Sequence, residues 1–166
     1  MGFQSTINIA QGFGVVGEIV FDGPTRAQPG VLKVGTSTAG GADIVVGRAF
    51  TIDAADGQFQ PGGTGTFGGI LANPKALSSI GTSSGGPLAP TLTVPAGEVG
   101  EFVTMGEILV ALPAAAAIGA LIYFTNATGI LGVGTAAGGQ TQIPTARVKR
   151  YANAAAGIAV ISLTEA

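Results

Sequence analysis

The chain has 166 residues, a length typical of one domain, and only 10% of them are charged, with 7 basic and 9 acidic side chains. It contains no His and no Cys, which excludes imidazole and thiolate catalysis, zinc sites built from those ligands, and disulfides. A typical globular domain carries about 25% charged residues, so the low charge predicts a surface that partners cover. The basic residues are few and scattered, which argues against a nucleic-acid partner.

Glycine and proline divide the chain into short apolar segments. The 29 Gly and 9 Pro residues disfavour long helices and favour short strands joined by tight turns. A polar loop is expected at 53–65, a single helical turn is compatible with 72–79, and residues 126–129 should close a hairpin. Strands are predicted, in chain order, at 15–21, 29–35, 43–52, 66–71, 91–95, 99–105, 107–112, 119–125, 130–133, 146–151 and 157–163. This spacing predicts a mainly β fold, a single β-sandwich or barrel.

The first 17 residues carry no charged side chain and show no helical period. Residues 6–11 alternate in part between polar and apolar, which indicates an extended conformation. We therefore expect residues 1–17 to form an extended N-terminal arm that docks on a neighbour, and residues 18–166 to form one β domain. No basic region and apolar core of a signal peptide is evident at this end.

One uncharged run, residues 108–124, invites comparison with a membrane span. A spanning helix needs about 20 apolar residues. This run is rich in Ala and contains Pro113 and Gly119. Buried strands account for it better, and no membrane is expected as a partner.

Two glycine patterns, at 12–17 and 63–68, match the G-x-G-x-x-G of dinucleotide-binding turns. Such a turn opens a helix, whereas Gly23-Pro24 follows the first pattern and Pro74 follows the second. We interpret both as loop glycines. We expect no cofactor.

The carboxylates do not form a recognisable catalytic or metal site. Asp53 and Asp56 lack the alternating spacing of a calcium loop, so no metal site is expected. A glycosidase-like carboxylate pair could be drawn, but the chain has no Trp and only 2 Tyr to support sugar rings. The sequence therefore predicts a protein without enzymatic activity.

Four of the basic residues each allow two interpretations. Arg26 and Arg48 lie beside predicted strand ends, where an Arg either stays solvated or binds a partner carboxylate in an interface. Arg147 and Lys149 fall on one face of a predicted strand. They form either a solvated edge that discourages strand pairing or a salt link to an acidic partner.

Several stretches, in order over nearly the whole chain, resemble the cement (decoration) proteins of tailed-bacteriophage capsids. These stretches are GFQ at 2–4, INI at 7–9, GVVGEI at 14–19, FDGPTR at 21–26, GRAFT at 47–51, FGGILANPK at 67–75, TMGE at 104–107 and GIAVISL at 157–163. The resemblance implies a jelly-roll-like β domain without catalysis or cofactor. It implies a virion protein, made in the bacterial host cytoplasm and bound to the outer capsid surface.

The same resemblance implies partners and a contact surface. The partners are the major capsid protein and a second or third copy of the chain, as a homodimer or homotrimer at symmetry axes. The capsid or oligomer interface is expected to include Phe3, Gln4, Ile7, Ile9, Phe13, Glu18, Asp22, Arg26, Arg48, Arg147 and Lys149. The alternative is a receptor- or carbohydrate-binding β module of a phage tail or head fibre, which an aromatic content of 6% disfavours.

Overall fold

The described part of the chain is built from β-strands. The computed structural model describes residues 14–20, 23–33, 44–74, 93–94, 97–151 and 153–164, and contains no helix within them. The strands there are β1 (Ile19–Val20), β2 (Arg26–Val31), β3 (Ile44–Val45), β4 (Ala49–Ile52), β5 (Phe59–Pro61), β6 (Thr66–Leu71), β7 (Thr93–Val94), β8 (Val99–Leu112), β9 (Leu121–Thr125), β10 (Leu131–Val133), β11 (Gln140–Arg150) and β12 (Gly157–Leu163).

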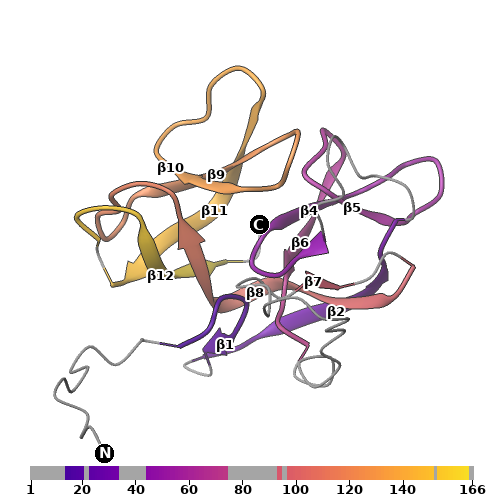
Figure 1. Ribbon diagram of the computed structural model, residues 1–166, viewed down its shortest axis with the longest axis horizontal. Coiled ribbons are helices and arrows are strands. Elements are labelled where there is room, and N and C mark those ends of the chain that lie inside the picture. Colours follow the sequence, from indigo (N-terminus) through magenta and orange to yellow (C-terminus); the bar gives the residue numbers. More distant parts are fainter. Residues whose placement is uncertain are drawn as a thin grey trace, which may run out of the picture.

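The longest strand, β8, connects the two halves of the fold (Figure 1). Its first half pairs with β2 and β6, and its second half pairs with β1 and β12, all antiparallel. The strands follow the order β10-β9-β11-β12-β8-β6-β4-β5 without closing into a ring of paired strands. Figure 1 shows β9 to β12 on one side of β8 and β4 to β6 on the other, while β3 and β7 pair separately.

The main core lies between these two halves. Alternation along the strands directs every second side chain inward, as in β9, where Ile122 and Phe124 are buried and their neighbours are half-buried. Val103 from the first half of β8 and Ile108 from the second half both join this cluster. The buried set also includes Ala49, Ile70, Ala72, Val110, Leu112, Ala116, Leu131, Ile143, Ala146, Val148, Ala159, Ile161 and Leu163.

A second, aromatic cluster fills the other face of β8, beneath β2, β4, β5 and β6. The Phe102 side chain lies on the face of β8 opposite to that of Val103. Its ring stacks on the Phe59 ring with centroids 4.0 Å apart, and its centroid lies 5.1 Å from that of the Phe50 ring. Gly30 of β2 leaves room for this stack, because a Cβ there would collide with the Phe59 ring. A parallel bridge between Leu32 and Phe59 brings the end of β2 over the cluster.

The mainly β class predicted from the sequence is confirmed, and the described topology is consistent with a β-sandwich. The predicted strands at 66–71 and 157–163 match β6 and β12 residue for residue, and the hairpin around 126–129 joins β9 to β10. Residues 108–124 contribute buried strand positions in β8 and β9. No helix follows either glycine pattern in the described residues, since β1 follows the first and β6 overlaps the second. The jelly-roll connectivity stays a prediction.

Other strand boundaries were wrong. The break predicted at Gly106 does not exist, because β8 runs through it with a φ of 118°. The segment 43–52 is divided by a turn at 46–47 into β3 and β4, and the loop predicted at 53–65 contains β5. Strand β11 begins at Gln140, six residues before the predicted start. Residues 72–74 are not helical, and the rest of that predicted turn lies outside the described residues.

The predicted division into an arm and a domain stays a prediction. Residues 1–13 lie outside the described residues. Of the remaining four arm residues, Gly17 donates its amide to the Leu109 carbonyl at 2.7 Å and accepts from the Asn73 amide at 2.8 Å. The described end of that segment therefore contacts the strands of the domain.

Candidate functional site

A pair of cations on β11 forms the most prominent charged feature of the described surface. Arg147 and Lys149 are exposed while Val148 between them is buried, so both lie on one face of the strand, as predicted. The Arg147 guanidinium donates to the Gly119 carbonyl at 3.2 Å. The predicted solvated edge is wrong, because β11 pairs with β9 on one side and β12 on the other.

A β-bulge aims the end of β11 at a buried carboxylate. Val148 pairs with Ile161 and Arg150 with Val160, which leaves Lys149 as the extra residue. The Lys149 ammonium forms a short ion pair with Oε1 of Glu107, and Arg150 Nη2 lies 3.8 Å from Oε2. Two cations from one bulge thus surround one acid of β8.

Glu107 is an unusual charged residue because its side chain is only 6% exposed. Burying a carboxylate without a partner is costly, so the two cations stabilise it in this position. Its Oε2 accepts no hydrogen bond from any residue that the structure describes. A cavity of about 220 Å³ lies beside it and is bordered by Pro24, Met105 and Thr164.

A second, wider depression of about 520 Å³ lies over β11 and β12 and adjoins that cavity at shared lining residues. The two share Lys149, Ser162 and Thr164, and the wider one adds the exposed side chains of Arg147 and Ile118. We call this combined depression the basic groove. Its lining combines the apolar side chains of Ile118, Pro144 and Val148 with the cationic side chains of Arg147 and Lys149.

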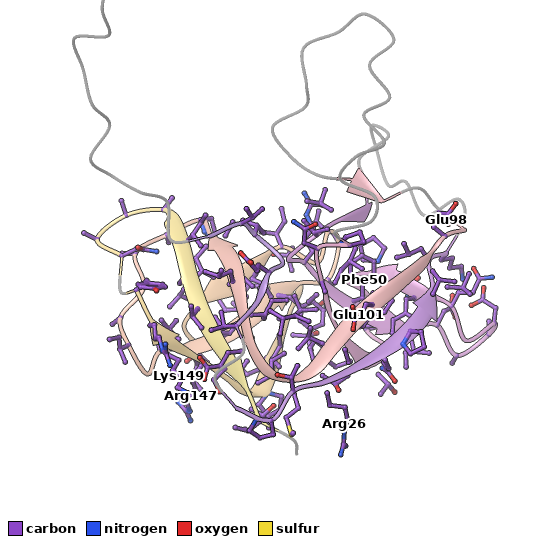
Figure 2. All side chains as sticks on the ribbon, turned by 90° about the horizontal axis from the view of Figure 1, so that it is seen from below. Arg26, Phe50, Glu98, Glu101, Arg147 and Lys149 are labelled. Atoms are coloured by element: carbon purple, nitrogen blue, oxygen red, sulfur yellow. The ribbon has the colours of Figure 1, made fainter. Side chains whose placement is uncertain are left out.

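Arg26 belongs to the same side of the molecule. It opens β2 opposite Met105, and Thr104 donates its hydroxyl to the Arg26 carbonyl at 3.3 Å. Figure 2 shows Arg26, Arg147 and Lys149 together on the lower side, with Glu98 on the upper side. The structure therefore brings these three predicted interface residues to one side.

Of the remaining predicted interface residues, the structure describes Glu18 and Arg48, and neither lines the basic groove. Val15 donates its amide to the Glu18 carboxylate at 3.4 Å, and Arg48 donates to the Thr128 carbonyl at 3.5 Å. Arg48 lines a different, apolar cavity near the end of β8. The other predicted members, Phe3, Gln4, Ile7, Ile9, Phe13 and Asp22, lie outside the described residues.

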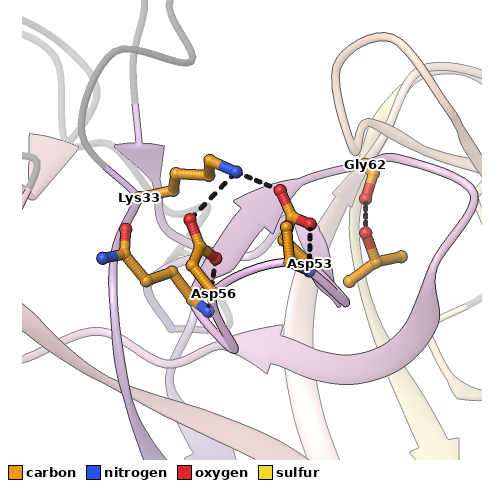
Figure 3. A network of polar contacts seen from close by, with 7 residues as sticks. Lys33, Asp53, Asp56 and Gly62 are labelled. Carbon is orange, nitrogen blue, oxygen red and sulfur yellow. Dashed lines mark hydrogen bonds and ion pairs between the residues drawn. The ribbon is translucent and has the colours of Figure 1, made fainter.

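A second ion-pair network joins β2 to the loop between β4 and β5 (Figure 3). Lys33 forms a short ion pair with Asp53 and lies 3.1 Å from an Asp56 oxygen. Lys33 donates hydrogen bonds to the carboxylates of Asp53 and Asp56, and these bonds, first that to Asp53, raise the pKa of Lys33. The bond accepted from Lys33 holds the pKa of Asp53 below its ordinary value. The sequence analysis missed this network, because nothing local links residues 20 positions apart. The ammonium group of Lys33 thus lies between the carboxylates of Asp53 and Asp56, in the position that a bound metal ion would otherwise occupy.

The described surface also exposes several large apolar side chains. Val31 and Val99 face each other across the β2–β8 pair, and both are exposed. Val15, Ile118, Ile130 and Tyr151 are exposed elsewhere. Sequence alone does not distinguish Val15, Ile118 and Ile130 from core residues, since each stands beside other apolar residues.

No group of three His, Cys, Asp or Glu side chains suited to a metal ion is found among the residues with described positions. Within that same part of the chain, no helix has the length and apolar character needed to cross a membrane.

Comparisons with known proteins identify the family. A sequence model described as "Structural cement protein (E217 gp24/Pam3 gp6)", of phage cement proteins, matches residues 3–164. A search of curated proteins found no match. Among the solved structures that are similar, a chain from "The capsid of Myoviridae Phage XM1" has a TM-score of 0.67 at 18% identity, over 99% of each chain, which shows a shared fold. Because the family match spans nearly the whole sequence, the chain belongs to the phage structural cement protein family.

Proposed function

We propose that this chain binds the outside of a tailed-phage capsid as a homo-oligomer, contacts the major capsid protein and stabilises its lattice. The observation that carries the proposal is the family match over residues 3–164. A protein bound only to the assembled shell shifts the equilibrium toward that shell by mass action. At a free concentration of about 100 times Kd, each occupied site contributes about 2.7 kcal/mol.

The character of the surface supports this role. Only 10% of the residues are charged, and Val31, Val99 and Ile118 are large, apolar and exposed. A capsid contact that covers such residues removes apolar area from water at low desolvation cost, because few charges have to be buried. This composition therefore favours a protein whose surface is buried against neighbouring subunits.

The basic groove is the part that we assign to the capsid contact. Lys149 is already engaged by Glu107, so Arg147 is the groove cation best placed to bind a carboxylate of the major capsid protein. An Arg–carboxylate pair is strong when both hydrogen bonds form and water is excluded. Arg26 lies on the same side and extends the positive surface (Figure 2).

The test is sedimentation of the purified chain with expanded empty capsids. Wild type is expected to co-sediment to saturation at a fixed ratio to capsid subunits. Arg147→Glu should weaken binding by about tenfold or more, since it converts an attraction into a repulsion. Arg147→Lys keeps the charge and should bind better than Arg147→Glu, while Glu98→Gln, on the other side of the molecule, serves as the control. Absence of saturable wild-type binding would refute the proposal.

A further inference from the structure

An apolar cavity of about 510 Å³ opens where β8 ends, away from the residues that line the basic groove. Its walls include Val16, Val46, Leu112 and Ile158. Two further wall residues are largely uncovered: Val15 is 58% exposed and Ile130 is 39% exposed. A cavity of this size with exposed apolar walls leaves apolar area in water that an inserted apolar side chain would bury.

The same place offers an open strand edge. Leu109 accepts from the Gly17 amide at 2.7 Å and donates to the Glu18 carbonyl at 2.9 Å, so its backbone groups face β1. Backbone direction alternates along a strand, so Ala111, two residues further, turns its amide and carbonyl to the same side. Among the described residues none bonds to these two groups on that side. Ala111 itself lines the cavity.

The described start of the chain, residues 14–17, turns away from this edge. Continuing β1 backwards in a straight line would place it beside Ala111. Instead, Glu18 donates its amide to the Val15 carbonyl at 3.1 Å, and a tight turn at 16–17 redirects the chain. Residues 14–17 therefore do not pair with Ala111.

We propose that this edge and cavity receive the N-terminal residues 7–13 of a second copy as an added strand. The proposal deepens the homo-oligomer part of the proposed function and rests on it. The segment carries no charge, and Ile7 and Ile9 project to one face of an extended chain while Asn8 projects to the other. Both isoleucines can thus enter the cavity while the backbone bonds to Ala111, which is the arrangement of strand addition.

Reach and connectivity favour a second copy over the same chain. Thirteen residues precede Gly14, and an extended chain advances about 3.3 Å per residue, so the segment spans roughly 43 Å. Gly14 already forms part of the cavity wall. Within one chain, Ile7 and Ile9 would reach the edge only after a second reversal inside residues 10–13. A neighbour's segment enters without that reversal.

The absence of Cys makes a cross-linking test direct. One chain carries Ile9→Cys and a mass tag, and a second chain carries Ile130→Cys at the rim of the cavity. The two are mixed and oxidised, both free in solution and bound to capsids, and separated on a non-reducing gel. We expect a mixed dimer under at least one of these conditions. Ile118→Cys, exposed in the basic groove, replaces Ile130→Cys as the control and should yield about tenfold less mixed product.

Two further variants examine the receiving side in the same assay. Ala111→Pro removes the outward amide and should lower the yield of mixed dimer at least several-fold. Ile130→Asp, with the cysteine moved to Val15, places a charge in the apolar rim and should do the same if Ala111→Pro fails to fold. A double variant, Ile9→Cys with Ile130→Cys, reports docking within one chain as a cross-linked monomer.

The outcomes separate the two proposals. A monomeric cross-link in the double variant without mixed dimers, or no cross-link in solution and on capsids, overturns the second-copy docking while leaving capsid binding intact. Mixed dimers in solution from a chain that does not co-sediment with capsids would support the docking and refute the capsid-binding function.

Discussion

Lys149→Met is expected to destabilise the fold by about 3 kcal/mol, because it leaves a buried carboxylate short of its main cation. The Glu107 side chain is 6% exposed, and after the change its remaining ion-pair partner is Arg150 at 3.8 Å. Removing the exposed partner, Lys149, leaves the negative charge of Glu107 buried, where water cannot solvate it. Met keeps the length and apolar stem of Lys, so lost packing adds little.

The reverse change should cost much less. Glu107→Gln leaves two cations whose side chains are 44% and 42% exposed, and both can return to water. The loss is then that of an ordinary polar contact, about 1 kcal/mol. The pair is therefore asymmetric: removal of the cation destabilises more than removal of the acid.

Urea unfolding followed by far-UV circular dichroism measures both effects, with equal m-values required for the comparison. Arg147→Met, on the same strand and face, has no acid partner among the described residues and should change stability by about 0.5 kcal/mol or less. Lys149→Met combined with Glu107→Gln should recover much of the loss. Equal costs for the two single variants, or a larger cost for Glu107→Gln, would refute the reasoning.

Three further results are expected. Phe102→Ala should lower the free energy of unfolding by about 4 kcal/mol in the same urea assay, because Phe102 is fully buried and stacks on Phe59; a cost near that of an exposed residue would contradict the aromatic cluster. Asp53 has its pKa lowered by Lys33, so its contribution is present above the ordinary Asp pKa and disappears as the pH falls through the lowered value. The difference in urea midpoint between wild type and Asp53→Asn should therefore shrink between pH 6 and pH 2, and a constant difference would contradict this. Gly30→Ala should destabilise the fold measurably in thermal unfolding, since the new Cβ collides with the Phe59 ring, whereas Gly138→Ala, which has open space, should not.

Local patterns predicted the strands where alternation and turn residues agree. The apolar segment that became β12 is uninterrupted in the sequence, and the hairpin around 126–129 has the expected short turn, so each could be assigned from nearby residues alone. The strand break predicted at Gly106 was wrong, although glycine weakens a strand and often marks an irregularity in it. In the structure Gly106 keeps β8 continuous where Thr25 approaches, since a Cβ would lie 3.0 Å from the Thr25 hydroxyl.

The candidate site depended on long-range pairing that no local pattern encodes. The shared face of Arg147 and Lys149 follows from alternation and was predicted. Their environment was not, because Glu107 reaches Lys149 only through the register of β8 with β12 and of β12 with β11. The bulge at Lys149 further depends on one unpaired residue in that register. The sequence therefore predicted the charges but not their partner.

We propose that the chain stabilises a capsid by binding its outer surface. The most direct measurement is the disruption temperature of expanded capsids with and without saturating chain, followed by light scattering or calorimetry. We expect an upward shift of this temperature that depends on chain concentration and is smaller for Arg147→Glu than for wild type at the same concentration. Capsids that come apart at an unchanged temperature despite full occupancy would contradict the claim.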